Sequence, residues 1–474
     1  MNTHIFYWLF ATMALCFRTV LCESFTPTAS WENLEYKRVL DVTKGYFAEK
    51  IALRVKNVDS IPISEYYLAL PAHSAGKVSI FTAAIPGTDT YLNCQLVPNI
   101  TVFNDGDFAS YGVVHIPTPI EPNQEFSFVA AIYYNVVGIP YPEHIAITDD
   151  QYLLTETDRL PFSAYRTYEG TFSITGSDSF EEINLPENEN LRGSIEGKSI
   201  VFGPWNDIQP FEKEEPVNVV YLHNAPLSDV TFLKRDVWVS HWASTLEFEE
   251  YYELTNRGAK LEKGFSRLEL MKDQQQKLSI QRTHYMALIE MILPKGSFGH
   301  YYTDLVGMVS TSHVQEDHFV LKPRYPIFGG WNYNFTIGWT NQLSDFLRVS
   351  DEEDMYILSV PLLDGQQDSS YDNTQLSIYL PEGAKIANVD APVPFVNLSL
   401  NTEKSYFDLN KGHVKVTFNF KNLANEIADG RILIKYQYTQ AAFYKKPVSI
   451  AIYIFVALMS FFLLKNINLT VTDK

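Results

Sequence analysis

Two apolar stretches, one at each end of the chain, constrain the fold most, because they determine which part can form a water-soluble body. The first extends from Ile5 to Cys22, and its Val20-Leu21-Cys22 end is typical of a cleavage site before Glu23. Its uncharged core is too short to cross a bilayer, so it predicts a signal peptide over residues 1–22 rather than a retained anchor. The segment is atypical in having His4 but no Lys or Arg before the core.

The second stretch, from Val448 to Leu464, contains no charged residue and predicts a transmembrane helix with a cytosolic tail over residues 465–474. As a helix it would rise about 26 Å, near the lower limit for a bilayer. Lys445, Lys446 and Lys465 can extend to the two interfaces. The alternative is a buried core helix, which normally has a polar side or more of the fold after it. Residues 23–447 would then face the lumen.

Charge and cysteine content narrow the class of protein further. Cleavage of the signal would leave 36 basic and 56 acidic residues, a net charge of −20. Such a surface repels nucleic acid, so no nucleic-acid partner is expected. Only Cys94 remains after cleavage, so the lumenal body has no internal disulfide and depends on a hydrophobic core. We interpret Cys94 as a small apolar core residue; a mixed disulfide with a partner is the alternative.

The interior of the chain has the alternation of β-strands. Residues 413–421 place Val414, Val416, Phe418 and Phe420 on one face. The same period of two recurs over residues 51–55 and 432–438. With 24 prolines, 23 glycines and 14% aromatic residues, the pattern favours antiparallel sheets over helices.

These features predict a mainly β protein with two tandem β-rich, sandwich-like lumenal domains, a few helices and one C-terminal transmembrane helix. The turn-rich stretch from Gly203 to Pro216 suggests a boundary, which gives domains over residues 23–225 and 226–440. Residues 37–42 (KRVLDV) resemble residues 234–239 (KRDVWV), and each segment is followed by a Glu-containing alternating run. This echo is consistent with tandem duplication, but a chance match is equally compatible with it.

Motifs for catalysis are missing from the predicted body. It contains no zinc-protease helix, phosphate loop, G-x-S-x-G elbow or C-x-x-C pair. His241, between Trp238 and Trp242, is interpreted as a packed histidine rather than a ligand. The run from Asp351 to Asp354 lacks the spacing of an EF-hand and is interpreted as a solvated loop. No catalytic residue, metal or cofactor is therefore predicted.

Four Asn-x-Ser/Thr sites occur in the sequence. Asn99, Asn334 and Asn397 lie in the predicted lumenal body and are candidates for glycosylation. Asn468 follows the predicted span and should stay unmodified. These sites indicate a compartment and exposed surface rather than an activity.

A series of ordered segments gives the chain a family resemblance. The segments are Asn256-Arg257-Gly258-Ala259, Gly264-Phe265-Ser266-Arg267, Tyr301-Tyr302 with Val309-Ser310-Thr311-Ser312-His313, residues 323–331 (PRYPIFGGW) and Leu380-Pro381-Glu382-Gly383-Ala384. Together they closely resemble ribophorin I, a subunit of the endoplasmic-reticulum oligosaccharyltransferase. The resemblance extends to Trp31-Glu32-Asn33-Leu34 and Gly203-Pro204-Trp205, and the short cytosolic tail is similar to that of fungal members.

The resemblance implies a plan of cleaved signal, two lumenal domains and one span in the endoplasmic-reticulum membrane. It also implies a noncatalytic, structural subunit, since catalysis belongs to a polytopic partner with a Trp-Trp-Asp motif. The complex transfers a preassembled oligosaccharide from dolichol pyrophosphate to Asn in Asn-x-Ser/Thr sites. Expected partners are this catalytic subunit, small membrane subunits and nascent polypeptides. This chain has no Trp-Trp pair, which agrees with that role.

The segment from Pro323 to Trp331 is the candidate interaction surface. Its prolines restrict the backbone around Arg324, and Gly329-Gly330 permits positive φ or close backbone approach. One interpretation is a rigid turn that packs its aromatic side chains into the second domain. The sharper hypothesis is that Tyr325, Phe328 and Trp331 form an exposed aromatic surface that contacts the catalytic subunit or a passing polypeptide.

Two other function classes remain open from the sequence. Exposed carboxylates on β-rich domains also suit a membrane-anchored lumenal hydrolase, which would turn over sugar or peptide substrates in isolation. A folding receptor would bind unfolded chains through aromatic patches without stable membership of a complex. Co-purification with the transferase distinguishes the structural subunit from both.

Overall fold

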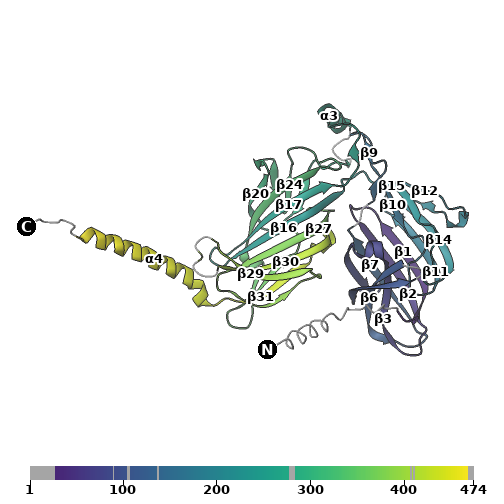
Figure 1. The fold of residues 1–474 in the computed structure, drawn as a ribbon, viewed down its shortest axis with the longest axis horizontal. Helices are drawn as coiled ribbons and strands as arrows, with labels where there is room; N and C mark the ends of the chain where they lie inside the picture. Colours follow the sequence, from purple (N-terminus) through teal and green to yellow (C-terminus); the bar gives the residue numbers. More distant parts are fainter. Residues whose placement is uncertain are drawn as a thin grey trace, which may run out of the picture. The chain divides into compact units, whose positions relative to one another are not determined.

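The computed structural model describes residues 27–88, 90–103, 107–135, 138–276, 283–405, 408 and 412–467. The predicted signal peptide, residues 1–22, and the tail from Asn468 onward lie outside the described residues. The described chain consists mostly of β-strands and has one long apolar helix near its C-terminal end (Figure 1). The prediction of a mainly β fold with a C-terminal apolar helix is therefore confirmed.

The chain divides into two compact units. Unit 1 comprises Met1–Val42, Ala48–Val136 and Thr155–Val219, and unit 2 comprises Thr43–Phe47, Val137–Leu154 and Val220–Lys474. Two short segments from the first half, Thr43–Phe47 and Val137–Leu154, thus belong to unit 2. The predicted ranges 23–225 and 226–440 place both segments in the first domain.

Unit 1 is built around a ten-stranded sheet with the order β13-β14-β11-β1-β2-β7-β4-β5-β6-β3. Its elements are β1 (Trp31–Asp41), β2 (Phe47–Asn57), β3 (Ile63–Pro71), α2 (Ala72–Ala75), β4 (Val78–Ala84), β5 (Tyr91–Phe103), β6 (Asp107–Ile120), β7 (Glu125–Tyr134), β11 (Thr167–Thr175), β12 (Phe180–Ile183), η1 (Glu189–Leu191), β13 (Ser194–Glu196) and β14 (Ser199–Ile208). The strands β10 (Tyr152–Thr157) and β15 (Val217–Leu222) each contain one of the points at which the chain changes unit.

Unit 2 is built around an eight-stranded sheet with the order β21-β20-β24-β17-β16-β27-β30-β29. Smaller sheets have the orders β19-β23-β22, β25-β26-β31-β28 and β18-β9. The elements are β8 (Ile139–Pro140), β9 (His144–Ile145), β16 (Ser228–Ser240), β17 (Thr245–Asn256), β18 (Lys260–Leu261), α3 (Arg267–Gln276), β19 (Ile289–Ile292), β20 (Phe298–Asp304), β21 (Gly307–Met308), β22 (Ser312–Gln315), β23 (His318–Leu321), β24 (Asn332–Gln342), η2 (Leu343–Asp345), β25 (Leu347–Val349), β26 (Met355–Pro361), β27 (Ser370–Leu380), β28 (Lys385–Asp390), β29 (Asn397–Glu403), β30 (His413–Ala424), η3 (Asn425–Ile427), β31 (Arg431–Gln437) and α4 (Gln440–Asn466).

The alternation in the sequence explains the core, because residues two apart point to the same face of a strand. In β30 Val416, Phe418 and Phe420 are buried, whereas Lys421 is exposed. In β31 Ile432 and Ile434 are fully buried and the intervening Leu433 is exposed. The predicted strands at residues 51–55 and 413–421 are thus confirmed, and so is the one at 432–438 except for Tyr438, which follows the end of β31.

The two segments with the Lys-Arg echo form corresponding strands of the two units. In unit 1, β1 pairs parallel with β11 and antiparallel with β2, and β11 pairs antiparallel with β14. In unit 2, β16 pairs parallel with β27 and antiparallel with β17, and β27 pairs antiparallel with β30. This shared connectivity supports an internal duplication, which the short sequence echo left open.

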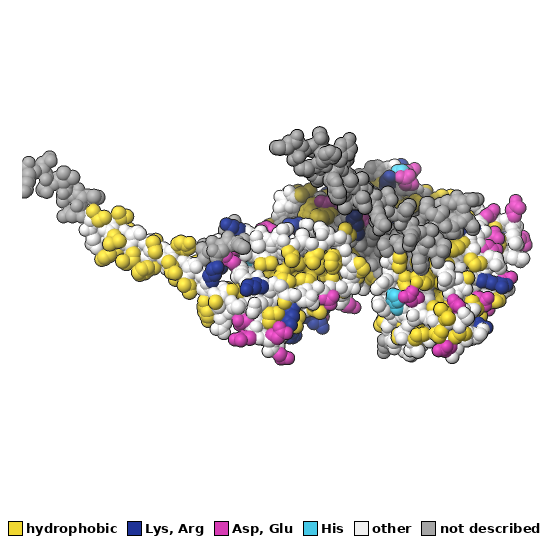
Figure 2. Space-filling view, turned by 60° about the horizontal axis from the view of Figure 1, so that its bottom comes forward, with side chains coloured by type: hydrophobic (Ala, Val, Ile, Leu, Met, Phe, Trp, Pro, Cys, Tyr) yellow, Lys and Arg dark blue, Asp and Glu magenta, His cyan; other side chains and the backbone are white. Residues whose placement is uncertain are grey.

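Helix α4 extends over 27 residues and is long and apolar enough to cross a membrane. It begins at Gln440, earlier than the predicted span at Val448, because Thr439 caps it by accepting a hydrogen bond from the Ala442 N–H (3.2 Å). Hydrophobic side chains follow the helix along its length in Figure 2, and none of its residues is buried.

Candidate functional site

Two of the sequence segments that carry the family resemblance, residues 256–259 and 323–331, meet at Asn256, at the end of β17. The Asn256 side chain is fully buried, and its Nδ2 donates hydrogen bonds to the carbonyl oxygens of His284 and Ile327, both at 3.0 Å. Its Oδ1 accepts hydrogen bonds from the backbone N–H groups of Leu227 (3.1 Å) and Gly258 (2.9 Å). One buried amide therefore joins β17 to three other segments, and its hydrogen-bonding capacity is satisfied.

Gly329 and Gly330 let the segment of residues 323–331 lie directly against this junction. A Cβ atom on Gly329 would lie 2.0 Å from the carbonyl oxygen of Ala259. Gly330 has φ +77°, and its N–H donates to the Asn256 carbonyl oxygen at 2.7 Å. Both predicted reasons for the glycines, close backbone approach and positive φ, are confirmed.

The structure corrects the place of Phe328 in the predicted aromatic surface. Phe328 is fully buried in a cluster with Ile147, Leu270 and Tyr285. The next residue, Gly329, packs its backbone directly against Ala259, and the Phe328 side chain beside this contact is 0% exposed. Phe328 thus anchors the segment and cannot contact a partner.

The remaining aromatic residues form a partly exposed face, here called the aromatic face and defined as Phe265, Tyr325 and Trp331. Phe265 and Tyr325 are exposed, and Trp331 is half-buried against the Phe328 cluster. The Trp331 ring lies 6.0 Å from Phe265 and 5.7 Å from Tyr325, in edge-to-face arrangements. An open groove of about 360 Å³ is lined by Phe265 and Trp331 together with His144, Lys260 and Lys263.

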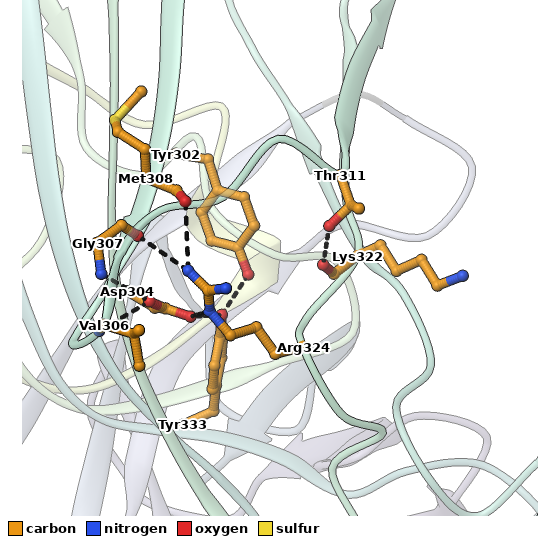
Figure 3. A network of polar contacts seen from close by, with 9 residues as sticks. All are labelled: Tyr302, Asp304, Val306, Gly307, Met308, Thr311, Lys322, Arg324 and Tyr333. Atoms are coloured by element: carbon orange, nitrogen blue, oxygen red, sulfur yellow. Dashed lines mark hydrogen bonds and ion pairs between the residues drawn. The ribbon is translucent and has the colours of Figure 1, made fainter.

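Arg324 does not add to this face but supports the turn between β20 and β21 (Figure 3). Its Nε donates to the Asp304 carboxylate at 2.5 Å, and its Nη2 donates to the carbonyl oxygens of Gly307 (3.4 Å) and Met308 (3.2 Å). The Asp304 Oδ1 accepts hydrogen bonds from the N–H groups of Val306 (2.9 Å) and Gly307 (3.1 Å). One guanidinium and one carboxylate thus fix every residue of the turn except Leu305.

The side chains behind this turn keep the Asp304 carboxylate charged. Burial alone would raise the pKa of Asp304, but the hydrogen bonds from Arg324, Val306 and Gly307 lower this pKa overall. The Tyr333 hydroxyl lies 2.5 Å from the Tyr302 hydroxyl and donates to Asp304 at 3.4 Å. Burial raises the pKa of Tyr333 to about 12, although the hydrogen bond with Tyr302 lowers it. Burial also raises the pKa of Tyr302. Neither tyrosine therefore competes with Asp304 for negative charge near neutral pH.

The supported turn displays three apolar side chains, here called the hairpin tip and defined as Leu305, Val306 and Met308. Their exposed fractions are 81%, 79% and 70%. Turns usually carry polar residues, because their side chains face water. A turn that is held rigidly and is apolar at its end has the properties of a protein contact site.

Sequence reasoning missed the hairpin tip and the place of Phe265 in the aromatic face. A signal for the tip was present, since Leu305 and Val306 stand between Asp304 and Gly307, a pair typical of a tight turn. Phe265 lies in a segment recognised for its resemblance, but only the tertiary structure brings it next to Trp331.

The predicted glycosylation sites differ in their surroundings. Asn397 is exposed at the start of β29. Asn334 lies within β24, half-buried, and its Nδ2 donates to the Tyr251 hydroxyl at 3.1 Å. Asn99 lies in β5. Their modification stays a prediction.

His241 packs as the sequence suggested. Its Nε2 lies 2.7 Å from the Tyr436 hydroxyl, and its ring contacts Tyr356 and Tyr438. Burial lowers the pKa of His241 to about 4, so the ring is neutral near neutral pH.

Cys94 is half-buried, and desolvation raises the pKa of its thiol to about 11. Its thiol thus has little thiolate character at neutral pH. Among the residues that the structure describes, no group of three or more His, Cys, Asp or Glu is arranged to hold a metal ion.

Comparisons with known proteins agree with the resemblance. Residues 31–465 match the family model described as Ribophorin I. The chain is 27% identical over 399 residues to dolichyl-diphosphooligosaccharide–protein glycosyltransferase subunit 1B of Arabidopsis thaliana, covering 81% of this chain and 82% of that protein. It is 25% identical to subunit 1 of Caenorhabditis elegans, covering 84% of this chain and 66% of the relative, so about a third of that relative lies outside the match. Subunit 1B of Oryza sativa subsp. japonica is 30% identical over 66% of this chain and 64% of its own length.

Proposed function

The chain belongs to the ribophorin I family, and from this membership we propose that it is a noncatalytic, structural subunit of the oligosaccharyltransferase complex. This complex transfers a preassembled oligosaccharide from dolichol pyrophosphate to Asn in Asn-x-Ser/Thr sites of nascent polypeptides. In this role the chain holds other subunits, among them the catalytic polytopic subunit and small membrane subunits, and presents acceptor chains to the complex.

Helix α4 provides the membrane anchor in this proposal. Its 27 residues extend about 40 Å, enough to cross a bilayer with part of the first turns in the interface. The two β-rich units then lie in the lumen of the endoplasmic reticulum, and the residues after α4 lie in the cytosol. The part of the chain that the structure describes has one candidate span, which contributes little to a binding site for a lipid-linked donor.

The observation that carries a scaffolding role is the supported hairpin tip. Three apolar side chains are 70–81% exposed, and a partner that covers them lowers the free energy of the complex by removing their apolar surface from water. Arg324 and Asp304 already fix the conformation of the turn. Because the turn loses little further conformational freedom when a partner covers it, the entropic cost of binding stays small. The tip thus suits a stable subunit contact.

The aromatic face suits the second part of the proposal, contact with passing polypeptide. Phe265 and Trp331 border an open groove, and an extended chain can lay its side chains against such rings. The groove also carries Lys260, His144 and Lys263, which provide polar contacts at its rim. Contacts of this kind are weak individually and fit transient presentation.

A double substitution tests the scaffolding role. Leu305→Ser with Met308→Ser in the full-length chain should lower recovery of the other subunits in a mild-detergent pull-down. Val349→Ser is the matched control, because Val349 is 77% exposed on a different hairpin of unit 2. Full recovery of the complex with the double variant, or equal loss with the control, would contradict the proposed role of the tip.

A second experiment separates presentation from assembly. Phe265→Ala with Trp331→Ala should leave the complex intact but reduce glycosylation of a subset of acceptor sites. Normal glycosylation of every acceptor in cells that carry this variant would show that the groove does not present chains.

A further inference from the structure

A pocket lies beside the first turns of α4. It has a volume of about 610 Å³, and its wall combines residues of β16, β17 and β24 with residues of α4 itself. It is separate from the aromatic face and the hairpin tip, whose residues do not line it.

The start of α4 is fixed against unit 2, so the position of the pocket relative to the helix is fixed as well. Pro447 lacks the N–H that would bond to the Phe443 carbonyl oxygen, and the Trp242 indole N–H donates to this oxygen at 3.2 Å. The rings of Trp242 and Phe443 are stacked at 4.5 Å. Lys446 Nζ also donates to the Asp408 carboxylate at 2.6 Å.

This arrangement puts the pocket at the level of the lipid headgroups. Lys445 and Lys446 line the pocket, and the uncharged apolar run begins at Val448, about 3 Å further along the helix axis from Lys446. Trp242 and Tyr444 are 51% and 56% exposed at the same level, as is typical of residues at a membrane interface.

The pocket carries charges of both signs, and Glu382 is a third carboxylate in its wall besides those of Glu247 and Glu249. Lys445 and Lys446 line its membrane end. Glu247 and Glu249 of β17 line it too. No ion pair of either carboxylate is found among the described residues, and Glu249 accepts a hydrogen bond from the Tyr301 hydroxyl at 2.6 Å. Trp238, Trp242 and Tyr438 add aromatic rings to the wall. Trp339 is 1% exposed, lines the pocket, and its indole N–H has no acceptor among the described residues.

We propose that this pocket binds the headgroup of a zwitterionic phospholipid with a choline or ethanolamine group. The phosphate fits Lys445 and Lys446 at the membrane end, the second of which also holds Asp408. The ammonium group fits Glu247, Glu249 and the aromatic rings. An anionic lipid without the ammonium group has no positive charge of its own to place beside the carboxylates of Glu247 and Glu249. The proposal goes beyond the structural role above and rests on α4 as a membrane span.

Native mass spectrometry of the delipidated full-length chain in detergent tests this, with phosphatidylcholine and phosphatidic acid as probes. The chain should retain phosphatidylcholine, and Glu247→Gln with Glu249→Gln should weaken its binding at least tenfold. Phosphatidic acid, which lacks the ammonium group, should bind the wild type more weakly than phosphatidylcholine. Glu253→Gln, on the same strand but outside the pocket, is the matched control.

Equal phosphatidylcholine binding by the wild type and the double variant would overturn the proposal, as would tighter or equal binding of phosphatidic acid. Release of the chain from membranes by alkaline extraction would also overturn it, because α4 would then not be a span. The double variant should still co-purify with other subunits. Loss of subunits from the Leu305→Ser, Met308→Ser variant, in contrast, concerns only the hairpin tip.

Discussion

The guanidinium of Arg235 lies 2.8 Å from the carboxylate of Glu250, and both side chains are fully buried. The same guanidinium forms an ion pair with Asp364 and lies 5.1 Å from the centroid of the Phe248 ring. In unit 1, Arg38 of β1 forms the corresponding ion pair with Glu49 of β2. Both units thus have an arginine on the strand between a parallel and an antiparallel neighbour, and its side chain is fully buried in unit 2 and 14% exposed in unit 1.

Arg235→Met should destabilise the protein strongly, because it leaves Glu250 buried without a counter-charge. Loss of one partner of a buried pair typically costs about 3–5 kcal/mol. The double variant Arg235→Met, Glu250→Met should recover part of this loss, since it removes the fully buried carboxylate and leaves only Asp364 without its counter-charge. Thermal unfolding of the full-length chain in detergent measures both, and a double variant less stable than the single one would contradict the explanation.

Gly329→Ala should disrupt the junction around Asn256. The added Cβ would lie 2.0 Å from the Ala259 carbonyl oxygen, so one backbone segment must move, at an expected cost of about 3 kcal/mol or more. Gly264→Ala is the control, because a Cβ there meets nothing within 4 Å. Unfolding midpoints of the two variants should differ clearly, and similar midpoints would show that the close approach is not needed.

His241 should make stability depend on pH in acid. Its pKa is about 4 in the folded chain against an ordinary value of 6.5, so the unfolded chain binds more protons between these values. Stability from this group is therefore present above pH 6.5 and is lost as pH falls towards 4. One pKa unit corresponds to about 1.4 kcal/mol, and partial exposure of the ring reduces the total to about 2 kcal/mol.

His241→Phe should remove this part of the pH dependence, because Phe has no proton to bind. The measurement is the change in melting temperature between pH 7 and pH 4.5 for the wild type and the variant. Parallel pH profiles would exclude His241 as the source.

Arg324→Ala should loosen the hairpin tip without unfolding unit 2, since the Arg324 side chain is 40% exposed and acts on one turn. The Val306 and Gly307 amides donate hydrogen bonds to Asp304, and their hydrogen exchange should accelerate by roughly tenfold. This factor corresponds to a fall of about 1.4 kcal/mol in the free energy of opening the turn. Lys322→Ala, an exposed neighbour, should leave these amides unchanged. Unchanged exchange rates in Arg324→Ala would show that the turn keeps its conformation without the Arg324 side chain.

The candidate site shows where sequence reasoning stops. The glycine pair before Trp331 indicated a close approach, because only glycine tolerates both a positive φ and a backbone in contact. The partner of that approach, residue 259, is 70 positions away and could not be identified from the sequence. For the same reason Phe328 was placed with Tyr325 and Trp331, although adjacent turn residues point in different directions.

The sequence by itself determined the β-rich class, the apolar C-terminal helix and the family, because alternation, length of an apolar run and ordered motifs are local properties of a chain. The tertiary structure alone decided that Arg324 supports a hairpin, that Phe328 is core, and that Phe265 borders Trp331. Those outcomes depend on contacts between residues far apart in the chain, such as Asp304 with Arg324 and Asn256 with Ile327. Such contacts form when strand pairing folds distant segments together, and no local pattern specifies them.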